Sequence, residues 1–238
     1  MRAPGDQYRG PSDRVVLGLA AAGLLAWDLA GGDALVAGWF GSSAGFPLRD
    51  HWLLARVLHD GGRWLSAAVL ALAVWDASRS PGRGPDARQR LRWLFAVLAC
   101  LVLVPALKRL SPTSCPYELQ AFGGTSQWLS HWQFWRPDGG QGHCFPSGHA
   151  VAGFAFLPIA RGWRQHDRLR SAAWLTTALV LGTAFGAAQV ARGAHFASHV
   201  GWSAWLCAVL AQFAAARPPA PHRTAGPRVW LAPPASGG

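Results

Sequence analysis

The residues best suited to chemistry in this chain are a single lysine and three histidines that interrupt long apolar segments. Lys108 ends one such segment, His149 follows Pro146-Ser147-Gly148 at the start of another, and His195 and His199 lie at the start of a third. Ionisable groups at a membrane are costly, so such positions indicate a functional site. An ammonium group, imidazoles and the N–H groups of a glycine-containing turn are suited to binding and cleaving a phosphate. The pattern therefore predicts phosphoryl chemistry.

The composition is that of a membrane protein. Hydrophobic residues make up 51% of the 238 residues, charged residues only 14%, and 14 residues are Trp, which favours membrane interfaces. The net charge of +11 could suggest a nucleic-acid binder. The arginines, however, cluster in the connections between apolar segments, so we expect membrane lipids as partners and no nucleic acid.

Six apolar runs approach the length needed to cross the hydrocarbon core of about 30 Å. They cover about 15–31, 64–77, 91–107, 148–163, 171–191 and 198–216. We therefore expect an all-α fold, a polytopic membrane protein built as a bundle of six transmembrane helices, over residues 1–217. The run at 64–77 is short, and residues 46–62 before it resemble an amphipathic helix on the membrane surface. The Pro-rich segment 218–238 predicts a disordered cytoplasmic tail.

The arginines indicate an orientation. If six helices span, 15 of the 22 cationic residues lie on one face, which the positive-inside rule makes cytoplasmic. Both termini are then cytoplasmic, and the segment 108–149 with its chemistry faces the exterior or periplasm, most simply across a bacterial inner membrane. Three Arg precede the first run, as in a signal peptide, but no small-residue cleavage site follows it, so we expect an uncleaved anchor.

The four cysteines divide by their predicted depth. Cys100 and Cys207 fall in apolar runs and are expected to be ordinary packing residues. Cys115 and Cys144 share one external loop, which lies in an oxidising compartment if the cell is a bacterium. We expect a disulfide between them, with two free thiols as the alternative.

Four short segments occur together in a recognisable order. They are Lys108, Cys115-Pro116, Pro146-Ser147-Gly148-His149, and Gly193-Ala194-His195 with His199 four residues later. This order resembles the signature of the type 2 phosphatidic acid phosphatase family, which also includes vanadium haloperoxidases. The family pattern is Lys, six residues, Arg-Pro; then Pro-Ser-Gly-His; then Ser-Arg, five residues, His, three residues, Asp.

The resemblance implies a role for each motif residue. His195 would attack phosphorus and form a phosphohistidine, and His149 would protonate the leaving oxygen. Lys108 and an arginine would neutralise the phosphoryl oxygens, while Ser147 and the N–H groups around Gly148 would donate hydrogen bonds to them. This scheme requires no metal and no cofactor.

Three positions depart from the family pattern. Cys115 replaces the first Arg, and Gln189 replaces the second, although Arg192 lies one helical turn later and could reach the same phosphate. His199 replaces the Asp that orients the nucleophile; a neutral imidazole can accept that hydrogen bond but supplies no negative charge. Glu118, the only Glu in the chain, is a candidate assisting acid.

The sequence thus predicts an integral membrane phosphatase that hydrolyses a phosphomonoester or diphosphate of a lipid at the external leaflet, with no obligate protein partner evident. The alternatives are a lipid-to-lipid phosphotransferase, a decayed lipid-phosphate-binding protein, and a membrane redox protein with haem on histidines. His195 and His199 could also bind a metal. His131 and His143 are expected to be solvated loop residues.

Overall fold

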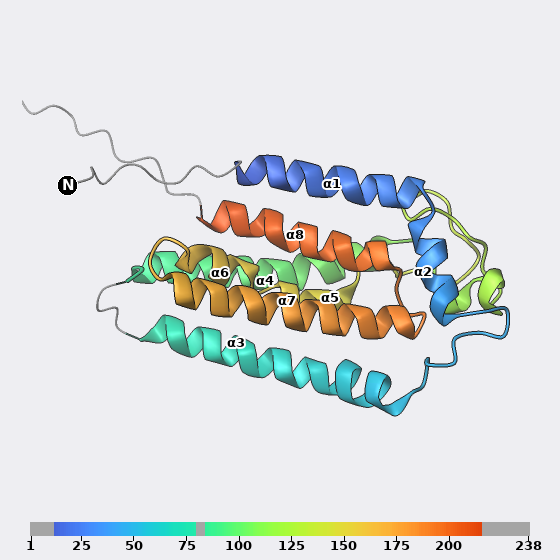
Figure 1. The fold of residues 1–238 in the computed structure, drawn as a ribbon, viewed down its shortest axis with the longest axis horizontal. Helices are drawn as coiled ribbons and strands as arrows, with labels where there is room; N and C mark the ends of the chain where they lie inside the picture. The colour runs from blue at the N-terminus through green and yellow to red at the C-terminus, as the bar shows by residue number, and fades with distance from the viewer. Residues whose placement is uncertain (1–11, 80–83, 216–238) are drawn as a thin grey trace, which may run out of the picture.

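Long helices run side by side along the molecule, and α2 with the segment 111–147 lies at one end of them (Figure 1). The computed structural model describes residues 12–79 and 84–215; the predicted Pro-rich tail 218–238 lies outside them. Two isolated β-bridges are the only strand pairing in these two ranges. The helices are α1 (Asp13–Leu29), α2 (Gly32–Phe40), η1 (Leu53–Gly61), α3 (Gly62–Ser78), α4 (Ala87–Leu110), η2 (Pro116–Glu118), η3 (Gln120–Phe122), α5 (Gly148–Phe154), α6 (Leu157–Trp163), α7 (Arg168–Ala191) and α8 (Ala197–Ala215).

Two helices of the described chain, α4 and α7, are each long and apolar enough to cross a membrane. Each has 24 residues, which corresponds to about 36 Å. The pair α1–α2 would be a third span if it crosses as one bent unit, since α2 turns by 68° from α1 after Gly31, whose φ is 74°. The predicted all-helical fold is confirmed for the described residues, while the count of six spans stays a prediction.

The predicted span 148–163 is interrupted, and that part of the prediction was wrong. The run forms two helices of seven residues, α5 and α6, which are separated at Ala155 and Phe156. Pro158 in the first turn of α6 has no N–H to continue the hydrogen-bond ladder of α5. The segment 46–62 contains the expected helix before α3, since Leu53–Gly61 is a π-helix that continues directly into α3. Residues 46–51 are not helical, and a position of η1 on the membrane surface stays a prediction.

Side-chain caps fix where two long helices begin. Asp86 Oδ1 accepts a hydrogen bond from Gln89 N (2.7 Å), and Gln89 Oε1 accepts one from Asp86 N (2.9 Å), which forms a capping box at the start of α4. Asp167 Oδ1 accepts from the N–H groups of Leu169 and Arg170 at the start of α7. Both caps satisfy donors that have no partner within the helix.

The main core lies between α4, α5, α6, α7 and α8. Trp93, Val97, Phe154 and Cys207 belong to it, and all are buried. Large apolar side chains also cover the outer surface of the bundle; Val102 of α4, for example, is 69% exposed. A helical bundle that is apolar both inside and outside suits a lipid surrounding.

The backbones of α5 and α7 touch at a pair of glycines. A Cβ atom on Gly153 would lie 2.0 Å from the backbone N of Gly182, a distance that no side chain can occupy. Small residues of this kind allow close contact between helices in membranes.

Candidate active site

Three segments that are distant in the sequence meet at the end of the bundle that carries α2. Lys108 lies in the last turn of α4, His149 in the first turn of α5, and His195 in the loop between α7 and α8. A Cβ on Gly148 would lie 3.6 Å from Lys108 Cδ, so the lysine stem passes over the start of α5. The ring centroids of His149 and His195 are 6.3 Å apart. The structure thus brings together the three residues that were expected to bind and transfer a phosphoryl group.

Ser147 holds the start of α5 in place. Its Oγ accepts a hydrogen bond from Ala150 N at 3.4 Å and so caps the helix, and its backbone N donates to His199 O at 3.2 Å. Ser203 Oγ lies 2.9 Å from both Ser147 O and His199 O. These contacts connect α5 to α8. They also fix the direction of the first N–H groups of α5, which lack acceptors within the helix.

The loop that carries His195 is anchored to the end of α7. The N–H groups of Ala194 and His195 both donate to Gln189 O, at 2.8 and 3.3 Å. Gly193 has a φ of 70°, in the left-handed region, and a Cβ there would lie 2.4 Å from the ring of Phe46. Glycine is therefore required at this position, and the loop has little freedom to move.

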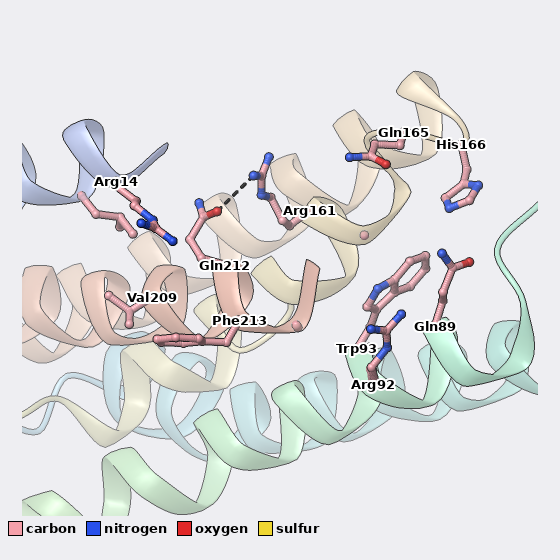
Figure 2. A pocket seen from close by; sticks show the side chains of 13 residues that line it. Arg14, Gln89, Arg92, Trp93, Arg161, Gln165, His166, Val209, Gln212 and Phe213 are labelled. Atoms are coloured by element: carbon pink, nitrogen blue, oxygen red, sulfur yellow. Dashed lines mark hydrogen bonds between the residues drawn. The ribbon is translucent and has the colours of Figure 1, made fainter. Parts of the chain in front are cut away.

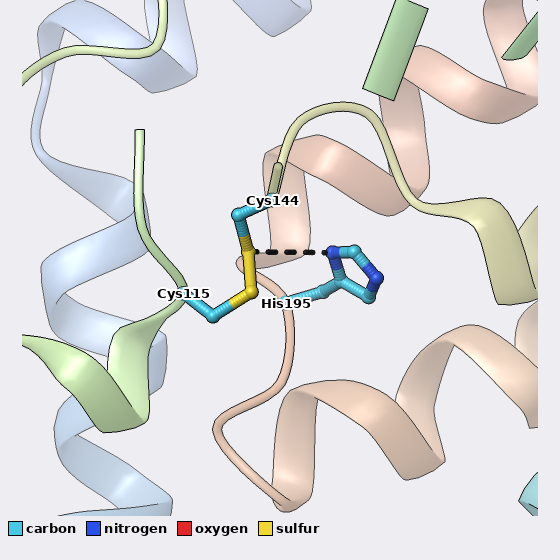
Figure 3. Close-up of side chains that lie close together, drawn as sticks. All are labelled: Cys115, Cys144 and His195. Atoms are coloured by element: carbon cyan, nitrogen blue, oxygen red, sulfur yellow. Dashed lines mark hydrogen bonds between the residues drawn. A yellow bond between two sulfur atoms is a disulfide. The ribbon is translucent and has the colours of Figure 1, made fainter. Parts of the chain in front are cut away.

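His195 is buried and is held in its neutral form. Its side chain is 2% exposed, and this burial, followed by the nearby charge of Lys108, lowers the pKa of His195 well below its usual range. Its Nδ1 lies 3.7 Å from Cys144 Sγ (Figure 3). A sulfur in a disulfide has no proton to donate. In this contact Nδ1 is therefore the donor, and the sulfur is a weak acceptor. This tautomer leaves a lone pair on Nε2, as a nucleophile requires.

Cys115 and Cys144 form a disulfide beside His195 (Figure 3). The bridge joins the loop after α4 to the segment before α5, and Cys144 N also donates to Thr113 O at 3.1 Å. With the sulfurs bonded to each other, they are not available as thiolate ligands for a metal. Cys100 and Cys207 are free and buried, as expected.

Glu118 stabilises the same loop. Its Oε2 accepts a hydrogen bond from Cys115 N at 2.8 Å, in the position of a helix cap. Tyr117 N donates to Gly193 O at 3.0 Å, which connects this loop to the His195 loop. The candidate assisting acid, Glu118, thus has a structural partner at the bridge.

Positive charge surrounds His149. The charges of Lys108, Arg192 and Arg63 all act on it, and the His59 ring packs on it with 4.2 Å between the centroids. The Nδ1 atom of His149 is buried and makes no hydrogen bond to any described residue. A surface of this kind favours a dianionic ligand such as a phosphate.

Arg192 lies beside Gln189, as the one-turn spacing predicted. Its Nη1 donates to Gln189 Oε1 at 3.3 Å and its Nε donates to Arg49 O at 2.7 Å. The guanidinium is therefore held by two acceptors while its charge acts on His149.

His199 contacts Cys144 and makes no hydrogen bond to His195. Its Nδ1 lies 3.1 Å from Cys144 O, and because a carbonyl can only accept, Nδ1 carries the proton. The centroids of the His195 and His199 rings are 5.8 Å apart. The expected hydrogen bond between His195 and His199 is thus absent from the structure. Both histidines contact Cys144 instead.

A buried polar network lies behind His199. His131, which was expected in a solvated loop, is only 7% exposed, and its Nε2 lies 3.3 Å from Asp28 Oδ2. Burial lowers the pKa of His131, and Asp28 opposes this shift. Asp33, His131 and His199 each place one donor atom within 4.8 Å of the others. The Asp33 oxygens, however, already accept from the backbone N and the hydroxyl of Ser198 at the start of α8, which favours a capping role over a metal site.

Sequence reasoning missed His59 and Asp33. His59 belongs to no motif. It contacts His149 because η1, which carries it, lies beside the start of α5. Asp33 is separated from Ser198 by 165 positions, and no local pattern reports such a tertiary cap.

A comparison with protein families supports the same chemistry. A family model described as the PAP2 superfamily matches residues 89–222, which is more than half of the chain. No curated protein and no solved structure matches the chain. The matched range contains Lys108, His149 and His195, which the structure brings together. The chain therefore belongs to the PAP2 superfamily, whose members are phosphoric ester hydrolases.

Proposed function

We propose that this protein is a membrane phosphatase that hydrolyses a phosphomonoester or diphosphate of a lipid through a phosphohistidine on His195. The observation that carries the proposal is the meeting of Lys108, His149 and His195 from three separate segments. A fixed cation and two imidazoles at one place supply charge neutralisation, a nucleophile and an acid.

The two histidines are suited to different steps. His195 is neutral, and its Nε2 carries the lone pair that attacks phosphorus. His149 has an unpartnered nitrogen and cations around it, so the arriving phosphate both binds there and raises its affinity for a proton. His149 then protonates the leaving oxygen, and later activates the water that hydrolyses the phosphohistidine.

A lipid substrate is supported by the surroundings of the site. Trp128, Phe134 and Trp135 lie in the segment 111–147 at the same end of the bundle, and Trp135 is 81% exposed. Exposed Trp side chains are typical of the membrane–water interface, where lipid phosphates lie. With all six apolar runs as spans, the distribution of arginines supports a site at the external leaflet with cytoplasmic termini.

The test is phosphate release from a panel of lipid phosphates and diphosphates, with trapping of the phosphoenzyme by acid-free denaturation of labelled protein. The parent should release phosphate and form a base-stable, acid-labile adduct. His195→Ala should lose both, and His51→Ala, a change at an exposed histidine outside the site, should lose neither. Turnover without a phosphoenzyme would contradict the nucleophile, and the absence of any turnover across the panel would favour a decayed binding protein.

A further inference from the structure

A cavity of about 330 Å³ opens at the end of the bundle opposite to His195 (Figure 2). It lies between the first turns of α1 and α4, the end of α6 and the last turns of α8. Arg92 in its wall precedes Lys108 by 16 residues on the same helix, which corresponds to about 24 Å. Since the hydrocarbon core is about 30 Å thick, a bundle that spans the membrane places the cavity and the candidate active site near opposite leaflets.

The cavity is strongly cationic. Arg14, Arg92 and Arg161 line it, and no Asp or Glu is among the described residues of its wall. Asp13 pairs with Arg161, but it also pairs with Arg164, so one carboxylate balances more than one guanidinium. The guanidinium groups of Arg14 and Arg161 therefore favour an anionic ligand in this space.

Arg161 has a donor without an acceptor. Its Nη2 donates to Gln212 Oε1 at 3.0 Å (Figure 2), and its Nε is buried and makes no hydrogen bond to the described part of the chain. This nitrogen has almost no accessible surface, so it does not face the cavity. An oxyanion in the cavity would instead meet the part of the Arg161 guanidinium that lines it, and amides from Gln89 and Gln165 reach the same space.

One wall of the cavity is apolar. Leu17 of α1 and Val209 and Phe213 of α8 form it, and Phe213 is 74% exposed. A volume at the low end of the range for ligand pockets fits a head group rather than a whole lipid. Its acyl chains would then continue past Phe213 along the exposed apolar side of α1, where Val16 and Leu19 lie.

We propose that this cavity binds the phosphate-bearing head group of an anionic phospholipid from the leaflet opposite to the candidate active site. The guanidinium groups of Arg14 and Arg161 bind the phosphate oxygens, and Phe213 and Leu17 contact the first carbons of the acyl chains. The ligand is a phosphodiester lipid that is bound and not cleaved.

The experiment measures lipid binding to the purified full chain in detergent by native mass spectrometry. Dioctanoyl phosphatidylglycerol is titrated against dioctanoyl phosphatidylcholine and against inorganic phosphate. The anionic lipid should bind at least about tenfold more tightly than either. Phosphatidylcholine brings its choline cation close to the arginines, which repel it, and inorganic phosphate lacks the acyl carbons that the apolar wall contacts. Arg14→Gln and Arg161→Gln should each weaken it about tenfold, and the double variant more.

Controls separate this cavity from other sites. Arg88→Gln removes an exposed arginine from the same end of α4 that does not line the cavity, and should leave binding unchanged. Arg14 is exposed, so Arg14→Gln keeps the test open if Arg161→Gln fails to fold. His195→Ala should bind phosphatidylglycerol as the parent does.

Three results would overturn the proposal. Equal affinity for the zwitterionic lipid would show that the arginines do not select the head group. Equal affinity for inorganic phosphate would show a site for a free anion. Binding that is lost in His195→Ala but retained in Arg14→Gln would place the lipid at the candidate active site.

Discussion

Removing the Cys115–Cys144 bridge should lower both stability and turnover, and the two effects can be measured separately. The bridge closes a loop with a sequence separation of 29 residues. The chain-entropy model gives about 3 to 4 kcal/mol for a loop of this length. Cys144 Sγ also contacts His195 Nδ1, so the bridge fixes the position of the sulfur against which the nucleophile rests.

Cys115→Ser is the informative change, because it breaks the bridge but leaves the Cys144 sulfur beside His195. We expect the melting temperature to fall by several degrees. Misplacement of a reacting group by about 1 Å can cost on the order of 100-fold in rate, so a tenfold to 100-fold loss of kcat is expected. Phosphate release should be assayed well below the melting temperature of the variant, and alkylation with mass spectrometry should confirm the free thiol.

The matched control is the Cys115→Ser, Cys144→Ser double variant treated with reductant. Reductant should slow the parent and leave the double variant unchanged, because only the parent has a bridge to break. A Cys115→Ser protein with the kcat of the parent and a lower melting temperature would refute the positioning argument. The bridge would then stabilise the fold without affecting the position of His195.

Four further predictions follow from the packing and charges. Gly153→Ala should lower the melting temperature markedly, because the new Cβ would overlap the α7 backbone; an unchanged melting temperature would contradict the close contact. Lys108→Met should reduce kcat by about 10² to 10³ with folding retained, measured by phosphate release, and a change confined to KM would argue against a role in the transition state. His199→Asn, which can donate to the same carbonyl, should retain more activity than His199→Asp, and the reverse order would restore the carboxylate-like role expected from the sequence. The free energy of unfolding should fall as pH drops below about 6.5, because His195 and His131 bind protons in the unfolded chain and stay neutral in the folded protein. A melting temperature that rises between pH 6.5 and 5 would contradict the lowered pKa values of these two histidines.

The helices and the motif residues could be predicted from the sequence because both depend on local patterns. Apolar runs located α4, α7 and α8 to within a few residues, and short motifs located Lys108 and His149. Pro158 is a local sign of the division of 148–163 into two helices, whereas the apolar run alone favours one helix.

The contacts across the bundle could not be predicted in this way. The position of His131 depends on Asp28, more than 100 residues away, and a loop composition gives no sign of such a buried partner. The tautomer of His199 likewise depends on the carbonyl of Cys144 and not on its own neighbours in the chain. Local patterns report the residue types available for chemistry, whereas these orientations arise from tertiary packing.

The glycine contact between α5 and α7 limits which parts of the candidate active site can vary. α5 carries His149, and α7 leads directly into the loop of His195, so the contact of main-chain atoms at Gly153 and Gly182 fixes the distance between the two helices that position these imidazoles. Main-chain contacts have no rotamers, and neither helix can approach or retreat without breaking the core. The distance between α5 and α7 is therefore fixed. We therefore expect differences in substrate preference to arise from η1, which carries His59, and from the exposed aromatic side chains of the segment 111–147 rather than from α5 and α7.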